Sequence, residues 1–393
     1  MSAREAVLNA IEGEWMAEQA LRLVEIPSVT CEEAEVCACF EAQLADLGFD
    51  VDAHEVTPGR RNLYAGIRGT NDGPTLLLNG HLDTIPIGDC TPVRREGDRI
   101  FGRGSTDMKG GVAAMLGAAK ALQEAEVRLK GNLLVTGVVG HEEPEAEKDG
   151  PLALVADVNS GRLKCDRILI VEGGDELWVM SMGSMVFTIT LTSERGGTHT
   201  NFVPFPENPI RHVGDLIRRI TERQRELDAG DVHPLAGPER IDLGIVHAGD
   251  YFNRTPGRCV LTGTRRWLPG KTMSSILIEL ESMAEPFARA GEMKLTVDMA
   301  LQREPFETPR NDPAVQAAAA AHREVVGADV RYVGRRLVGD ANIYMNETGV
   351  PTFYYGPSNE TAHSDDEWVS VARIEAAARV YALMAMNYCG VED

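Results

Sequence analysis

Short apolar runs recur along the chain at residues 75–79, 132–139, 167–171 and 352–355. Each run is bounded by Gly, Pro, Asn or Asp, which is typical of buried strands. Between the first two runs, apolar side chains recur at helical spacing, at Val112, Met115, Leu116, Ala119 and Leu122. This alternation of strand and helix predicts an α/β fold with a mostly parallel sheet and helices on both of its faces.

The middle of the chain has a different pattern, that of an α+β unit. Its strands are predicted at 187–191, 258–264 and 294–299, with one amphipathic helix in each interval. The chain then returns to the first pattern, with a helix near 313–326. We therefore predict a catalytic domain at residues 1–181 and 299–393, and an inserted domain at 182–298.

Composition narrows the class of protein. The length of 393 residues suits two domains, and a net charge of −21 repels nucleic acid and anionic membranes as main partners. The longest apolar runs fall well short of the ~20 residues of a membrane-spanning helix. The first twenty residues are acidic and contain no apolar block, unlike a secretory signal. The seven cysteines are odd in number and scattered, which indicates reduced thiols, so we expect a cytoplasmic protein.

Clusters of reactive side chains follow the predicted strands. The first contains His81 and Asp83, at the edge of the sheet where open α/β sheets bind ligands. A metal-bound His often donates its second N–H to a carboxylate, and Asp83 is suitably spaced for that, although such a pair alone is more often a surface turn. The second cluster, Gly102–Gly111, matches neither glycine pattern of a nucleotide-binding loop and presents Asp107 as a ligand instead.

The third cluster, His141-Glu142-Glu143, comes directly after a strand. Two adjacent carboxylates repel each other unless a cation or a shared proton compensates, and a solvated acidic loop is the equal alternative. From there to about Asp166 the chain reads as a long loop. The fourth cluster is Glu172, another acid at the end of an apolar strand, and His363 follows the last such strand.

Two His and three carboxylates are about the right number of ligands for two divalent ions: His81, Asp107, Glu143, Glu172 and His363. One carboxylate would bridge the ions, and each ion would take one His and one further acid. Glu142 is then left over as a base. Two ions so placed clamp a hydroxide and the oxygens of an acyl transition state.

The order and spacing of these pieces resemble the M20 family of metallopeptidases and amidohydrolases over nearly the whole chain. That family includes carboxypeptidase G2-type enzymes, acetylornithine deacetylase, succinyl-diaminopimelate desuccinylase and aminoacylases. The resemblance implies Asp107 as the bridging ligand, with further metal ligands at His81, Glu143, Glu172 and His363. It also implies Glu142 as the general base and Asp83 as the support of His81.

The inserted unit resembles the family's lid or dimerisation domain, which implies a homodimer formed through this domain. The resemblance rests on residues 196–199 and 208–210, and it implies that His199 enters the active site of the partner subunit and stabilises an oxyanion. Asn253 and Arg266 match a stretch that contacts a substrate carboxylate in the family, with Arg265 as the neighbouring alternative.

Together these features predict a dinuclear-metal hydrolase of amide bonds in small substrates, of the N-acyl amino acid deacylase or carboxypeptidase type. Zinc is the first expectation for the two ions, with cobalt or manganese as alternatives. The expected substrate carries a carboxylate, which the planar guanidinium of Arg266 suits.

Three alternatives stay open. The chain is a family member that has lost catalysis and only binds a small molecule, an amidohydrolase for an unusual amine such as an aromatic one, or a nucleotide-dependent enzyme built on residues 102–111. The first alternative depends on His141, which stands where the family usually has Asp.

Overall fold

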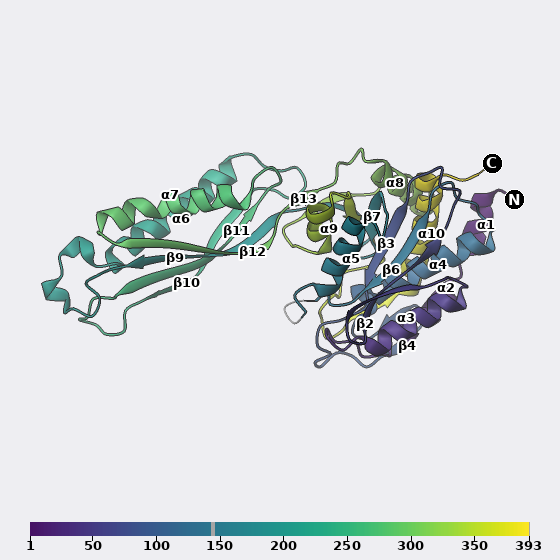
Figure 1. Cartoon of the computed structure of the whole chain (residues 1–393), viewed down its shortest axis with the longest axis horizontal. Helices are drawn as coiled ribbons and strands as arrows, with labels where there is room; N and C mark the ends of the chain where they lie inside the picture. The colour runs from purple at the N-terminus through teal and green to yellow at the C-terminus, as the bar shows by residue number, and fades with distance from the viewer. Residues whose placement is uncertain (143–145, 393) are drawn as a thin grey trace. The chain divides into compact units, whose positions relative to one another are not determined.

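The computed structural model describes residues 1–142 and 146–392, which fold into two compact units (Figure 1). The first unit consists of Met1–Val179, Thr308–Val333 and Ile343–Asp393. The second consists of Met180–Glu307 and Gly334–Asn342. The chain therefore enters the second unit twice, once through a long segment and once through a short one.

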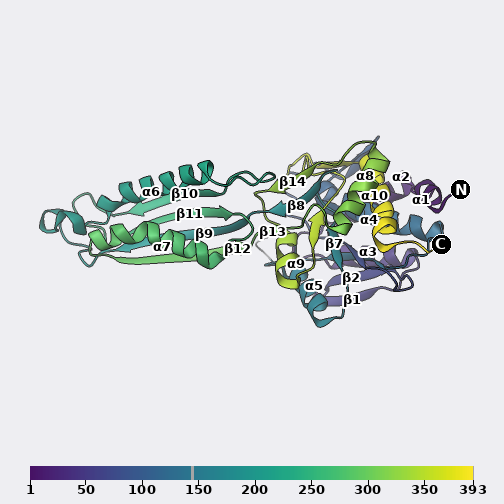
Figure 2. The ribbon, with the colours of Figure 1, turned by 90° about the horizontal axis from the view of Figure 1, so that it is seen from above.

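The core of the first unit is a sheet whose central strands are parallel. In spatial order these are β6 (Leu133–Val138), β3 (Leu76–His81), β7 (Arg167–Ile170) and β15 (Thr352–Tyr354). Helices cover both faces of the sheet (Figures 1 and 2). Most residues of these strands are apolar and nearly all are buried, as expected where both faces are covered. The predicted α/β class with a mostly parallel sheet is confirmed.

Antiparallel strands extend this sheet on both sides, and they are not among the strands predicted from the sequence. A hairpin of β1 (Asp52–Thr57) and β2 (Arg60–Ile67) lies next to β6, and β8 (Leu177–Ser181) lies next to β15. β2 begins with Arg, Arg and Asn, which leaves Leu63–Ile67 as its apolar part. β1 lies at the edge of the sheet, where much of a strand faces solvent, so its sequence carries little apolar signal.

The segment between β6 and β7 was predicted as a long loop, and that prediction is wrong, because it contains helix α5 (Asp149–Ser160). Gly150 and Pro151 read as loop residues in the sequence. They lie in the first turn of the helix, where Pro is tolerated because its missing N–H would have no intrahelical partner there.

Helix α4 (Gly110–Glu124) is buried on nearly every side, more completely than its amphipathic spacing predicts. Two glycines permit this close packing. A Cβ on Gly111 would lie 1.8 Å from the carbonyl oxygen of Val171, and one on Gly117 would lie 2.2 Å from the sulfur of Met16. The contact at Gly111 brings the first turn of α4 against the end of β7, which places Asp107 and Glu172 in the same region.

The other helices surround this core, and α10 packs against α2, α4 and α8. Their bounds are Ala3–Asn9 (α1), Gly13–Val24 (α2), Ala34–Asp46 (α3), Pro313–Val326 (α8), Asp340–Thr348 (α9) and Val371–Cys389 (α10). Short strands complete the chain: β4 (Arg94–Glu96), β5 (Arg99–Phe101), β13 (Phe306–Glu307), β14 (Tyr332–Arg335) and β16 (Trp368–Ser370). Among the helices of the described residues, none has the length and apolar character that crossing a membrane requires.

The second unit contains an antiparallel sheet covered by two helices (Figure 2). Its strands lie in the order β10 (Arg240–Ala248), β11 (Arg258–Trp267), β9 (Gly183–Thr192) and β12 (Lys294–Arg303). Helices α6 (Ile210–Ala229) and α7 (Met273–Ala290) pack on the face that carries Met185, Phe187 and Ile189. The sequence pattern missed β10, because this edge strand is largely exposed and so mixes polar and apolar residues.

Candidate metal centre

The ends of the central parallel strands bring candidate ligands from distant parts of the chain together. Each strand contributes one: β3 ends at His81, β6 precedes Glu142, β7 precedes Glu172, and β15 precedes His363. Asp107 joins them from the turn Ser105–Lys109, which leads into α4. Parallel strands end at the same edge of a sheet, and open α/β sheets bind their ligands at that edge.

Asp107 faces two imidazoles with its two carboxylate oxygens. Its Oδ1 lies 3.0 Å from Nε2 of His81, and its Oδ2 lies 3.1 Å from Nε2 of His363. The same nitrogen of His363 lies 3.2 Å from Oε1 of Glu142. One carboxylate thus contacts two histidines through different oxygens, which is the arrangement expected of a ligand shared between two ions.

His81 is held in one orientation by the loop that follows β3. Its side chain is buried, and its Nδ1 lies 2.9 Å from the backbone carbonyl oxygen of Asp83. In the neutral ring Nδ1–H donates to that carbonyl, which leaves the lone pair on Nε2, the nitrogen that faces Asp107. The Asp83 carboxylate is 3.7 Å from Nδ1, so it supports His81 through its charge and not through the expected hydrogen bond.

The Asp83 carboxylate holds the loop that carries Glu142. It accepts the backbone N–H of His141 at 3.0 Å, that of Glu142 at 2.9 Å, and the hydroxyl of Thr30 at 2.8 Å. Asp83 is fully buried. Charge-assisted hydrogen bonds are strong in such a medium, so Asp83 fixes the backbone at Glu142.

A buried ion pair anchors the start of the same loop. Arg60 lies 2.6 Å from Glu33 and 2.5 Å from Asp149, and Glu33 accepts the N–H of Gly140 at 2.9 Å. Sequence reasoning missed these residues, because each belongs to a different segment and none lies in a recognisable motif. Only their contact in the folded chain shows that they position the loop.

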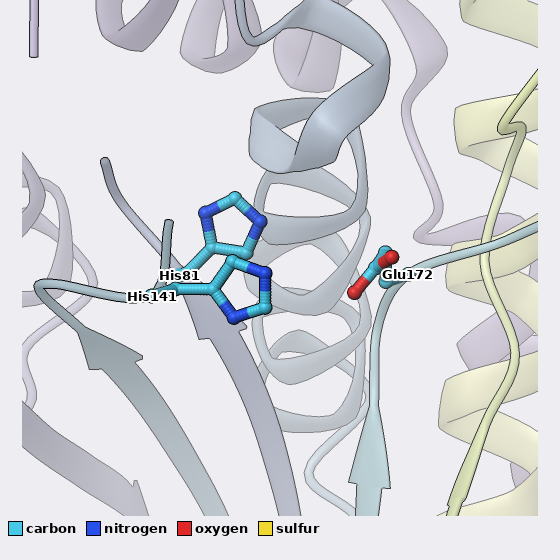
Figure 3. Close-up of side chains that lie close together, drawn as sticks. All are labelled: His81, His141 and Glu172. Carbon is cyan, nitrogen blue, oxygen red and sulfur yellow. The ribbon is translucent and has the colours of Figure 1, made fainter. Parts of the chain in front are cut away.

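Glu172 and His141 lie beside His81 (Figure 3). One ligand atom from each of these three residues lies within 4.8 Å of the others, and the same holds for His81, Asp107 and Glu142. The rings of His81 and His141 are stacked, with centroids 4.0 Å apart and planes 7° from parallel. His141, which the sequence marks only as a departure from the family, therefore belongs to the centre.

Glu367 and Arg103 tie together the segments that carry Asp107 and His363. Glu367 accepts the N–H of Thr106 at 3.0 Å and that of Asp107 at 3.1 Å through Oε1, and it accepts from Arg103 at 2.6 Å through Oε2. Both charged side chains are buried. In the sequence, Glu367 is only the last acid in an acidic stretch, so nothing there separates it from its solvated neighbours.

The carboxylates favour the protonated form of both histidines. Burial lowers the pKa of His81, but the hydrogen bond and charge of Asp107 outweigh this effect and raise that pKa to about 10. Hydrogen bonds to Asp107 and Glu142 raise the pKa of His363 to about 10. Despite burial, hydrogen bonds from the two histidines hold the pKa of Asp107 well below its usual range.

This donor set fits divalent metal ions. Imidazole nitrogen and carboxylate oxygen are the ligands that zinc, cobalt and manganese take in proteins. Metal ions compete with protons for such groups, so a bound cation would displace protons from His81 and His363. Glu143, the remaining predicted ligand, lies outside the described residues.

The predicted oxyanion and substrate residues lie in the second unit. Nδ2 of Asn253 is 3.2 Å from Nε2 of His199, so these two predicted residues lie together. His199 also accepts the N–H of Asn201 at Nδ1, at 3.2 Å, which opens a short helical turn.

The neighbouring arginines Arg265 and Arg266 point to opposite faces of β11, as successive residues of a strand do. Arg265 is fully buried and lies 2.6 Å from a carboxylate oxygen of Glu239, so it is part of the core of the second unit. Arg266 is half-buried, and burial lowers the pKa of its guanidinium. It donates to the carbonyl oxygen of Arg336 at 2.5 Å. Of the two, Arg266 is the more exposed to solvent.

Comparisons with known proteins agree on one family. The sequence model of peptidase family M20/M25/M40 matches residues 77–387. N-formyl-4-amino-5-aminomethyl-2-methylpyrimidine deformylase of Bacillus subtilis (strain 168) is 24% identical, over 88% of this chain and 87% of that protein. Succinyl-diaminopimelate desuccinylase 2 of Ruegeria sp. (strain TM1040) is 27% identical, over 94% of each chain. The crystal structure of aminopeptidase PepT from Bacillus cereus ATCC 10987 has the same fold, with a TM-score of 0.80 at 18% identity, over 96% of this chain and 99% of that one.

Proposed function

The chain belongs to the M20 family of metal-dependent hydrolases, and from that premise we propose that it is a dinuclear amidohydrolase with Glu142 as its general base. The observation that carries the proposal is the contact of Asp107 with two histidines through two different oxygens. A carboxylate in that position would join two metal sites. His81 and Glu172 would complete one site, and His363 and Glu143 the other.

Glu142 is the group that would move the proton. When bound, divalent ions make a water molecule more acidic and polarise the substrate carbonyl. The Glu142 carboxylate accepts the proton of the attacking water and returns it to the leaving nitrogen. Its backbone is held by Asp83, and its side chain is buried beside His363, so the carboxylate is preorganised for both transfers.

The division of labour between the adjacent glutamates provides the main test. Glu142→Gln should abolish turnover and leave the metal content near two ions per chain, measured by elemental analysis. Glu143→Gln should lower the metal content as well. A Glu142→Gln protein that keeps most of its activity would show that the base is another residue. Reconstitution of the metal-free protein with zinc, cobalt or manganese identifies the metal that supports turnover. Zinc is the metal that we expect first.

The proposed substrate is an amide whose leaving amine carries a free carboxylate, such as an N-acyl amino acid or a short peptide. Arg266 supports this class, because a planar guanidinium binds a carboxylate bidentately. The net charge of −21 repels anions at long range, so a local cation must hold such a substrate. Amidation of that carboxylate should cost about 2–4 kcal/mol in kcat/KM, and Arg266→Ala should erase the difference. Equal turnover of the acid and its amide would exclude the class.

A second candidate is an amide of an aromatic amine. The Bacillus subtilis relative named above removes a formyl group from an aminomethylpyrimidine. The similarity to that relative extends over most of both chains. A panel that contains N-formyl and N-succinyl derivatives of aromatic amines and of amino acids separates the two classes. A preference for the uncharged aromatic amines would favour the second.

The second unit is proposed as a lid and dimerisation domain, inserted at about residues 182–298, with His199 acting in the partner subunit. Exposed aromatic side chains support an interface here. Phe202 and Phe205 follow His199 in the chain, and Tyr251 and Phe252 directly precede Asn253, which contacts His199. All four aromatic side chains are 62–85% exposed. His199→Ala and Glu142→Gln proteins, each inactive, should recover activity when mixed and allowed to exchange subunits. No recovery after proven exchange would mean that His199 acts in its own subunit or not at all.

A further inference from the structure

His141 lies in the centre, but the proposed function gives it no role. Its ring is stacked on that of His81, with centroids 4.0 Å apart. In Figure 3 a ring nitrogen of His141 points toward Glu172, and the ligand atoms of the three residues all lie within 4.8 Å of one another. Two roles are compatible with that position. His141 is either a second nitrogen ligand for the ion held by His81 and Glu172, or a hydrogen-bond donor to that site.

Lys148 decides between these roles. Its Nζ lies 3.3 Å from Nδ1 of His141, and the lysine is 6% exposed. An ammonium group has three donors and no acceptor, so the nitrogen that faces it must carry the lone pair. The single proton of the neutral ring is then on Nε2, and a protonated nitrogen does not bind a metal ion.

The contrast with His81 supports this assignment. A ligating His usually gives its other N–H to a carbonyl or carboxylate oxygen. His81 fits that pattern, because its Nδ1 meets the carbonyl oxygen of Asp83 at 2.9 Å. At the corresponding nitrogen of His141 the contact is a cationic donor, which is the reverse of what a metal ligand requires.

We propose that His141 is a positioning residue that donates Nε2–H to the Glu172 carboxylate, with its tautomer set by Lys148, and that it is not a metal ligand. This inference rests on the proposed role of Glu172 as a ligand. A carboxylate held in this way keeps one oxygen directed at the ion and loses less side-chain freedom when the ion binds.

Substitution by the two amides tests the proposal, because each mimics one imidazole nitrogen. Gln can place an amide N–H near the position of Nε2, whereas Asn reaches only the position of Nδ1. Zinc affinity measured by chelator competition should stay within about threefold for His141→Gln and fall about 10–100-fold for His141→Asn, the usual effect of losing an outer-shell partner. The absorption spectrum of the cobalt-loaded protein should be the same for wild type and His141→Gln, because the ligand set is unchanged.

Three results would overturn the proposal. If both variants lose affinity equally and the cobalt spectrum changes, His141 is a ligand. If neither variant changes affinity, His141 does not act on the site. If nitrogen chemical shifts of 15N-labelled histidines place the single ring proton of His141 on Nδ1, Lys148 does not set its tautomer. A wild-type chain that binds no divalent metal would instead refute the proposed function, and this inference with it.

Discussion

Replacement of Asp83 by Asn tests whether this carboxylate positions Glu142. The buried carboxylate accepts two backbone N–H groups and one hydroxyl, at 2.8–3.0 Å. An amide offers one oxygen, and its NH2 group must face one of the backbone donors. In the cheaper orientation the N–H of His141 loses its acceptor, which costs about 1–3 kcal/mol for a buried group. The bonds that remain also lose their charge assistance, so we expect Asp83→Asn to lower the free energy of unfolding by about 2–4 kcal/mol.

The effect on catalysis follows from the same geometry. In the variant, the NH2 group of the new side chain faces the backbone N–H of His141, and repulsion between these two donors pushes the loop away from position 83. A displacement of about 1 Å at a reacting group costs on the order of 100-fold in rate. We therefore expect kcat/KM of Asp83→Asn to fall about 100-fold at saturating metal, with urea unfolding measured in parallel. Thr30→Val is the matched control, because it removes the neutral donor and keeps the charge. Thr30→Val should lower the free energy of unfolding by about 1 kcal/mol and change turnover only a few-fold. An Asp83→Asn protein within threefold of wild type in turnover would refute the positioning role.

Other predictions concern protonation and buried charge. The pKa values of His81 and His363 are raised to about 10, so both rings are protonated at pH 8 in the metal-free protein. Calorimetry of metal binding in buffers of different ionisation enthalpy should then show about one proton released per ligating His at pH 8. Proton release should fall to zero above pH 10, and the apparent affinity for the metal should rise with pH up to that point. Glu367→Gln should destabilise the fold by about 3–5 kcal/mol and weaken metal binding, because it leaves Arg103 as an unpaired buried charge. Thermal unfolding and chelator competition measure the two effects. Arg265→Met should destabilise the second unit by less than Glu367→Gln destabilises the fold, because Glu239 keeps Lys271 and Glu279 keeps Arg223 as a cationic partner. It should leave the substrate preference unchanged, in contrast to Arg266→Ala, as unfolding and kinetic assays would show.

The parallel core of the fold was predictable because its strands are continuous apolar runs. Residues 75–79 and 167–171 are recognisable as buried strands from their residue types alone, since a strand whose two faces are both covered is apolar throughout most of its length. The polar start of β2 and the exposed edge strand β10 carry no such signal, and the sheet alone makes them strands. Helix α5 was missed because Gly150 and Pro151 resemble a turn until their place in a first helical turn is known.

The candidate site was predictable in its chemical groups but not in its contacts. His81 ends one apolar strand, and Glu172 and His363 follow two others. Parallel strands bring the residues at their carboxyl ends to one edge of the sheet, so the meeting of these three residues follows from the pattern. No local pattern links Glu33 to Arg60, or Glu367 to Asp107, because these pairs form between segments far apart in the chain.

The sequence by itself determined the α/β class and the supply of imidazoles and carboxylates at strand ends, because both depend on residue type and local order. Only the tertiary structure decided which atom faces which. It turns the Asp83 carboxylate to the loop of Glu142 and only its backbone carbonyl to His81, and it lays the ring of His141 on that of His81 with Lys148 behind it. Hydrogen-bond partners depend on distances of about 3 Å between segments, and such distances exist only after the chain has packed.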